Sequence, residues 1–134
     1  MACAPPPTIR ADSGIPCLLL VEDDVLVRIT VALMLEDDGF DVVEASTAPE
    51  ALRLIKGGLH AAAIVTDVDL GAGLNGMELA DELHVLRPDV AVVFITGRTA
   101  SLAGRTLAHQ EAVLLKPFEG SALSGLIRKL LTVR

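Results

Sequence analysis

Carboxylates, a hydroxyl and an ammonium group stand at or just after the ends of short apolar segments of this 134-residue sequence. They are Glu22 and Asp23 at the end of the first segment, Asp67 and Asp69 at the end of the third, Thr96 at the end of the fourth and Lys116 at the end of the fifth. Carboxylates a few ångströms apart repel one another and stay ionised only when a hard cation such as Mg²⁺ lies among them. Phosphoryl transfer to an aspartate requires such a set, because Mg²⁺ and lysine neutralise the phosphoryl oxygens while the hydroxyl hydrogen-bonds to one of them.

Each of these residues, taken alone, also has a purely structural explanation. Asp24, next to Glu22 and Asp23, is a typical residue to cap the following helix, and a lysine at the end of a strand is usually a solvated charge. The chemical interpretation therefore depends on whether the fold brings these side chains together.

The apolar segments predict buried β-strands. Each contains five to seven residues that are mainly aliphatic and do not alternate with polar ones, which is typical of strands covered on both faces. The segments are 17–22, 40–45, 61–67, 91–96 and 112–116.

Segments of helical length separate and follow the predicted strands. One of them begins at the Thr47–Glu50 capping box and ends at Gly57-Gly58. The others are 24–38, 76–86, 99–110, which contains Gly104, and 119–132. Alternation of strands and helices indicates a doubly wound α/β domain with a five-stranded parallel sheet and helices on both faces. Ligands of such sheets bind at the carboxyl ends of the strands, where the polar residues above converge.

The composition excludes several classes of protein. Hydrophobic residues make up 51% of the chain, so it is not disordered as a whole, and no apolar run is long enough to span a membrane. A formal net charge of −7, three Phe, and no Trp or Tyr make binding to nucleic acid improbable. Two cysteines exclude a disulfide scaffold. No secretory signal is visible, and we expect a cytoplasmic protein.

We expect two regions along the chain. Residues 1–16 hold four of the seven prolines and predict a disordered tail, whereas residues 17–134 form one domain. The last predicted helix runs almost to Arg134, so we expect no output module after it.

Five motifs in this order resemble the receiver domains of two-component response regulators. They are LLLVEDD at 18–24, Asp67, NGMEL at 75–79, Thr96-Gly97 and Lys116-Pro117-Phe118. The resemblance covers residues 17–133 and implies the flavodoxin-like fold with strand order 2-1-3-4-5.

The resemblance also implies a role for each site residue. Asp67 would be the phosphoacceptor, while Asp23 would bind Mg²⁺ directly and Glu22 mainly through a water. The backbone carbonyl of Asp69 would be a further metal ligand. Thr96 and Lys116 would contact the phosphoryl group, and the Lys116-Pro117 bond is commonly cis in the family.

A stand-alone receiver of this kind would be phosphorylated by a histidine kinase or a histidine phosphotransfer protein. It would catalyse only its own phosphorylation and dephosphorylation, so it is not expected to be an enzyme with an external substrate. Its output would be a contact with a downstream protein. The last helix is apolar enough to allow a homodimer, although core packing explains the same residues.

The sequence departs from the family at two positions. Val113 stands where the family usually has Tyr or Phe, whose ring swings inward when the threonine moves; an atypical, mostly single-domain subgroup of receivers also lacks this ring. Gly71 stands where receivers often have proline. Gly71, Gly73 and Gly76 match the G-x-G-x-x-G pattern, but no acid follows at the distance that dinucleotide binding requires, so we interpret them as turn residues.

Two other functions and one local contact remain as alternatives. The chain could be a receiver from a hybrid histidine kinase. Asp67-Val68-Asp69 matches the D-x-D of haloacid-dehalogenase-like phosphatases, although there the motif ends the first strand and the metal-binding acids come later. Asp69 and Arg98 could pair across the site and slow hydrolysis of the phosphoryl group. The three histidines show no ligand spacing and are expected at the surface.

Overall fold

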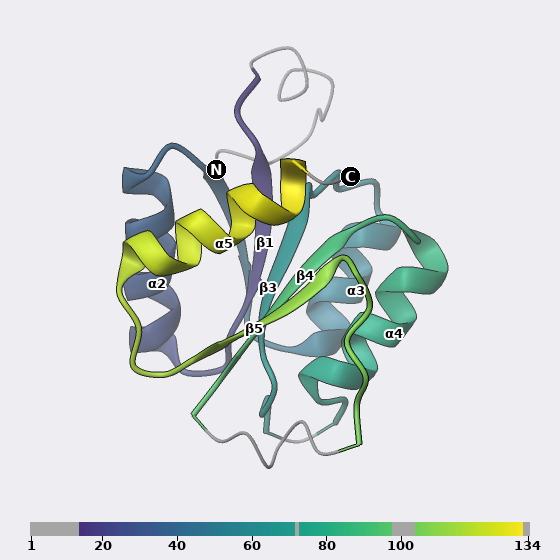
Figure 1. Ribbon diagram of the computed structural model, residues 1–134. Helices are drawn as coiled ribbons and strands as arrows, with labels where there is room; N and C mark the ends of the chain where they lie inside the picture. Colours follow the sequence, from purple (N-terminus) through teal and green to yellow (C-terminus); the bar gives the residue numbers. More distant parts are fainter. Residues whose placement is uncertain (1–13, 72, 98–103, 133–134) are drawn as a thin grey trace.

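A five-stranded parallel sheet forms the centre of the protein (Figure 1). The structure, a computed structural model, describes residues 14–71, 73–97 and 104–132. The strands are β1 (Cys17–Val21), β2 (Asp41–Ala45), β3 (Ala63–Asp67), β4 (Ala91–Thr96) and β5 (Glu111–Leu115), in the order β2-β1-β3-β4-β5. All four neighbouring pairs are parallel. The predicted fold class and strand order are therefore confirmed.

In the described part of the chain, four helices cover the two faces of this sheet. Helices α2 (Val25–Asp37) and α5 (Gly120–Thr132) pack on one face, and α3 (Ala48–Lys56) and α4 (Gly76–Leu86) on the other (Figure 1). Every residue of β1, β3 and β4 is buried, which explains why these strands are continuously apolar rather than alternating. The core is aliphatic apart from Phe40 and Phe94.

The helix starts follow from local side-chain chemistry. Asp24 caps α2 by accepting a hydrogen bond from the Val27 N–H at 3.0 Å, so the structural explanation of this acid is correct. Thr47 caps α3, but the Glu50 side chain accepts from Ser46 rather than from Thr47. Helix α4 begins with a complete capping box formed by Asn75 and Glu78.

The predicted helix over 99–110 is wrong in its described part. Residues 98–103 lie outside the described residues, and residues 104–110 form turns and irregular structure. Gly104 has φ +83°, a conformation that a right-handed helix does not contain. Arg105, the next residue, is drawn toward α4 and β5 by ion pairs with Asp81 and Glu111.

Two predictions concern the start of the chain and membrane-spanning segments. Most of the predicted tail over 1–16, namely 1–13, lies outside the described residues, so the division into a tail and a domain over 17–134 stays a prediction. Among the helices that the structure describes, none has the length and apolar character needed to cross a bilayer.

Candidate functional site

The polar residues predicted from the sequence meet at the carboxyl edge of the sheet. Backbone hydrogen bonds align the strand ends there: the Val68 N–H donates to the Ile95 carbonyl at 3.1 Å, and the Lys116 N–H donates to the Thr96 carbonyl at 2.9 Å. Thr96 is completely buried at the end of β4, next to the strand that carries Asp67. Because all strands are parallel, their last residues must lie side by side.

Three carboxylates form a cluster at this edge. One oxygen from each of Glu22, Asp23 and Asp67 lies within 4.8 Å of the others. Glu22 and Asp67 are buried, with 5% and 8% of their surface exposed, whereas Asp23 is exposed. Oxygen ligands at this spacing, with one open side, suit a hard divalent cation that keeps some of its waters.

Lys116, the residue after β5, completes the cluster. Its Nζ lies 3.0 Å from Oδ2 of Asp67 and 3.6 Å from Oε1 of Glu22. The Lys116-Pro117 peptide bond is cis, as the resemblance implies. Burial lowers the pKa of Lys116, but the hydrogen bond and charge of Asp67, together with Glu22, outweigh it and raise that pKa above its usual value. The side chain is therefore a stable cation beside the Asp67 carboxylate.

Glu22 is the carboxylate whose titration the site perturbs most clearly. Burial and the negative charge of Asp67 raise the pKa of Glu22 from 4.5 to about 7, although the Asp24 N–H and Lys116 act in the opposite direction. The Asp24 N–H donates to Oε2 of Glu22 at 3.1 Å. The part of this rise that comes from the negative charge of Asp67 is the part that a bound cation would compensate.

The backbone around Asp67 is closely packed. The Asp69 N–H donates to Oδ1 of Asp67 at 3.0 Å, and the Thr66 hydroxyl donates to the Asp67 carbonyl at 2.9 Å. A Cβ added to Gly76 at the start of α4 would lie 2.3 Å from that carbonyl oxygen. Only glycine lets α4 approach Asp67 this closely.

Comparisons with known proteins agree with this geometry. The model of the response regulator receiver domain family matches residues 18–128. The chain belongs to the response regulator receiver family. The receiver identified here is 32% identical over 120 residues to the aerobic respiration control protein ArcA of Escherichia coli strain K12. That match covers 87% of the chain and 49% of ArcA.

Two further comparisons show the range of proteins that contain similar domains. The receiver is 30% identical over 122 residues to the sensor kinase CckA of Brucella abortus, covering 89% of the chain and 13% of CckA. The response regulator TrrA of Thermotoga maritima, solved in complex with Mg²⁺-BeF, has the same fold with a TM-score of 0.77 at 20% identity. That likeness covers 87% of the receiver and 99% of the TrrA chain. The receiver thus spans about half of ArcA and a small part of CckA.

The structure brings together most, but not all, of the predicted site residues. Glu22, Asp23, Asp67 and Lys116 are in one cluster, with Thr96 on the adjoining strand end. Asp69 contributes its N–H to Asp67, and the metal-binding role of its carbonyl stays a prediction. Arg98 lies outside the described residues, so its pairing with Asp69 also stays a prediction.

The two departures from the family have visible structural consequences. Val113 is half-buried and packs against the core cluster on the α3 and α4 side of the sheet. Gly71 and Gly73 have φ values of +73° and +93°. Proline requires φ near −65°, so the receiver's Gly71 adopts a conformation that the proline common in the family cannot adopt.

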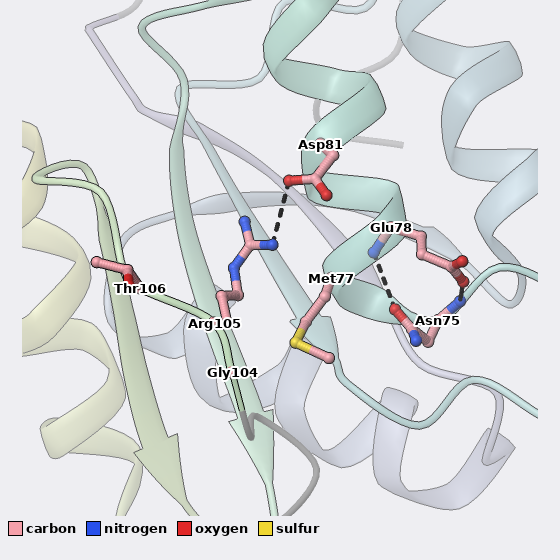
Figure 2. A pocket seen from close by; sticks show the side chains of 7 residues that line it. All are labelled: Asn75, Met77, Glu78, Asp81, Gly104, Arg105 and Thr106. Atoms are coloured by element: carbon pink, nitrogen blue, oxygen red, sulfur yellow. Dashed lines mark hydrogen bonds and ion pairs between the residues drawn. The ribbon is translucent and has the colours of Figure 1, made fainter.

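An ionic network between α4 and β5 was not predicted from the sequence. Arg105 pairs with Asp81 at 3.1 Å (Figure 2). It also pairs with Glu111 at 2.6 Å and lies over the ring of Phe94. The Glu111 side chain is only 2% exposed. His84, expected at the surface, lies 3.5 Å from Glu111 and belongs to this network. No spacing rule signals such a network, because its members come from three separate segments.

The ionic network borders an open pocket on the receiver, shown in Figure 2. Its lining consists of Asn75, Met77, Glu78, Asp81, Gly104, Arg105 and Thr106. None of the three clustered carboxylates belongs to this lining. The pocket is therefore separate from the acid cluster.

Sequence analysis also missed Arg28 on α2. Its Nη1 donates to the Glu22 carbonyl at 3.0 Å, and its Nε donates to Oε1 of Glu44 on β2 at 3.1 Å. The i, i+6 separation between Glu22 and Arg28 spans the turn that starts α2, so no helical or strand periodicity connects them.

Proposed function

We propose that this receiver accepts a phosphoryl group on Asp67 in a Mg²⁺-dependent reaction in the cytoplasm. The donor would be a phosphorylated histidine of a kinase or a phosphotransfer protein. The observation that carries the proposal is the position of Lys116 Nζ, 3.0 Å from the buried Asp67, beside three carboxylates within 4.8 Å of one another. A structural salt bridge would need one acid for one lysine, whereas this site has an excess of acids.

The donor set fits Mg²⁺. Glu22, Asp23, Asp67 and the carbonyl of Asp69 would hold the ion, and all of them offer oxygen atoms. The raised pKa of Glu22, to which the charge of Asp67 contributes, supports the proposal that this site favours added positive charge. When bound, Mg²⁺ would neutralise part of the negative charge on the phosphoryl oxygens in the transition state.

The protein's own residues would orient and stabilise the reacting groups. An oxygen of the Asp67 carboxylate would form the new O–P bond as the N–P bond to the donor histidine breaks, and the electron pair of that bond would return to the imidazole. Lys116 would hold the carboxylate before transfer and a phosphoryl oxygen afterwards. The Thr96 hydroxyl would donate to a phosphoryl oxygen. Water attack on phosphorus would later restore Asp67 and release phosphate.

The proposed receiver acts on itself and has no external substrate. Its output would be a contact with a downstream protein, because a change in charge at Asp67 is a local event that must be read by a partner. The match to CckA supports a second context, in which the domain is the receiver of a hybrid histidine kinase. The chemistry at Asp67 would be the same in both contexts.

Phosphorylation by acetyl phosphate tests the proposal directly. Wild-type protein and Asp67→Asn are incubated with acetyl phosphate and Mg²⁺, and the added phosphoryl group is measured by intact-mass spectrometry. We expect labelling of the wild type only, and none in EDTA. Equal labelling of both proteins would overturn the assignment of Asp67, and turnover of an external phosphomonoester would favour a phosphatase instead.

A further inference from the structure

The end of β1 is held to the end of β2 by both main-chain and side-chain contacts. The Glu22 N–H donates to the Ala45 carbonyl at 3.0 Å. The Glu22 carbonyl accepts from Arg28, whose guanidinium is held in turn by Glu44. The Arg28 side chain is 17% exposed and the Glu44 side chain 37% exposed, so both of these contacts are partly shielded from water.

The oxygen that Arg28 binds belongs to the peptide unit joining Glu22 to Asp23. The orientation of this peptide unit depends on ψ of Glu22 and φ of Asp23, and it determines how the two side chains diverge. A hydrogen bond to its oxygen therefore restricts the relative directions of two clustered carboxylates. Small displacements of such groups have large effects, because metal sites depend on ligands being held in place by outer partners.

We propose that Arg28 is a positioning residue for the carboxylate cluster. It holds the Glu22–Asp23 peptide so that both side chains face Asp67, and it thereby sets the affinity of the site for Mg²⁺. This inference rests on the proposed function, because it assumes that the cluster binds Mg²⁺.

The geometry favours this positioning role over a direct effect of the arginine charge. One edge of the Arg28 guanidinium already forms an ion pair with Glu44, and the other donates to a main-chain oxygen rather than to a clustered carboxylate. Arginine suits this arrangement because its planar guanidinium donates in two fixed directions, which a lysine ammonium does not.

The test compares Mg²⁺ binding of wild type, Arg28→Gln and Glu44→Gln by isothermal titration calorimetry. The chain has no Trp or Tyr, so its intrinsic fluorescence is not a useful probe. We expect Arg28→Gln to weaken Mg²⁺ binding by about tenfold or more, as for other outer partners of metal ligands. Glu44→Gln leaves the bond to the Glu22 carbonyl and should have a much smaller effect.

A second measurement needs no metal. Hydrogen exchange of the Asp24 amide, which donates to the Glu22 side chain, reports the conformation of the β1 end in EDTA. We expect faster exchange in Arg28→Gln than in the wild type. Arg53→Gln is the matched control, because Arg53 is an exposed arginine on α3, and it should change neither Mg²⁺ affinity nor exchange at Asp24.

The possible outcomes separate the inference from the proposed function. Unchanged Mg²⁺ affinity in a folded Arg28→Gln variant would overturn the inference. An equal loss of Mg²⁺ affinity in Glu44→Gln would also overturn it, because the effect would then belong to the link between α2 and β2. If Arg28→Gln does not fold, Arg28→Lys replaces it; an intermediate loss of affinity supports the inference and wild-type affinity overturns it. Failure of the wild type itself to bind Mg²⁺, or labelling of Asp67→Asn, would instead refute the proposed function.

Discussion

Replacing Glu22 with glutamine should stabilise the metal-free protein at high pH and leave its stability unchanged at low pH. The pKa of Glu22 is raised from 4.5 to about 7, first by burial and then by the charge of Asp67. Between these two values the folded protein holds a proton that the unfolded chain has released. The free energy of unfolding contributed by this group therefore falls as pH rises through that window.

The size of this effect follows from the shift. Each pKa unit corresponds to about 1.4 kcal/mol, so a shift from 4.5 to about 7 sets a ceiling of roughly 3 kcal/mol at pH 8. Glutamine resembles the protonated acid in shape and cannot ionise. We therefore expect the free energy of unfolding of Glu22→Gln to exceed that of the wild type by roughly 1–3 kcal/mol at pH 8 and to match it near pH 4.

Urea unfolding in EDTA at pH 4, 6 and 8 measures this difference. The control is Glu36→Gln, which removes an exposed acid from α2. Added Mg²⁺ should reverse the order at pH 8, because the wild type keeps a ligand that the variant has lost. A stability difference between wild type and Glu22→Gln that is constant from pH 4 to pH 8 would refute this reasoning.

Two further predictions concern contacts that support the site and the segment before β5. Gly76→Ala should destabilise the protein by about 1–3 kcal/mol in urea unfolding and slow labelling of Asp67 by acetyl phosphate, because the new Cβ would lie 2.3 Å from the Asp67 carbonyl oxygen. The control is Gly125→Ala, whose Cβ would have nothing within 4 Å. In the same two assays this control should be neutral or stabilising. Arg105→Gln should lower the free energy of unfolding in urea by about 3–5 kcal/mol, because it leaves the buried Glu111 carboxylate without its guanidinium partner. The double variant with Glu111→Gln should recover part of that loss, and a double variant less stable than Arg105→Gln would contradict the explanation.

The acid cluster could be predicted because it depends on topology alone. Glu22, Asp67 and Lys116 each follow an apolar run, and parallel strands place their carboxyl ends at one edge of the sheet. Neither the exact side-chain directions nor the distances were needed for that conclusion. The same reasoning predicted the sheet and its two helical layers, since continuous apolar runs alternating with helical segments favour few other arrangements.

Contacts made across the fold could not be predicted from the sequence. Arg28 and Arg105 are polar residues in segments with no distinguishing spacing, and their partners become neighbours only after the chain has folded. The error in the described part of the predicted helix, residues 104–110, has the same origin. Apolar residues and helix formers in that segment favoured a helix, whereas Gly104 in the left-handed region and the ion pairs of Arg105 favour an irregular chain over 104–110.

The carboxylate cluster is supported from both layers of helices. On one face, Arg28 of α2 binds the main chain of Glu22; on the other, Gly76 of α4 lies against the main chain of Asp67. The strand ends are thus restrained in the backbone, so mutual repulsion cannot easily move the carboxylates apart. Burial, and after it the charge of the nearby Asp67, raises the pKa of Glu22, so proton uptake lowers the charge of the cluster without moving its backbone. A cation that displaces this proton would bind to ligands already in position, and its binding should therefore become tighter as pH rises through about 7.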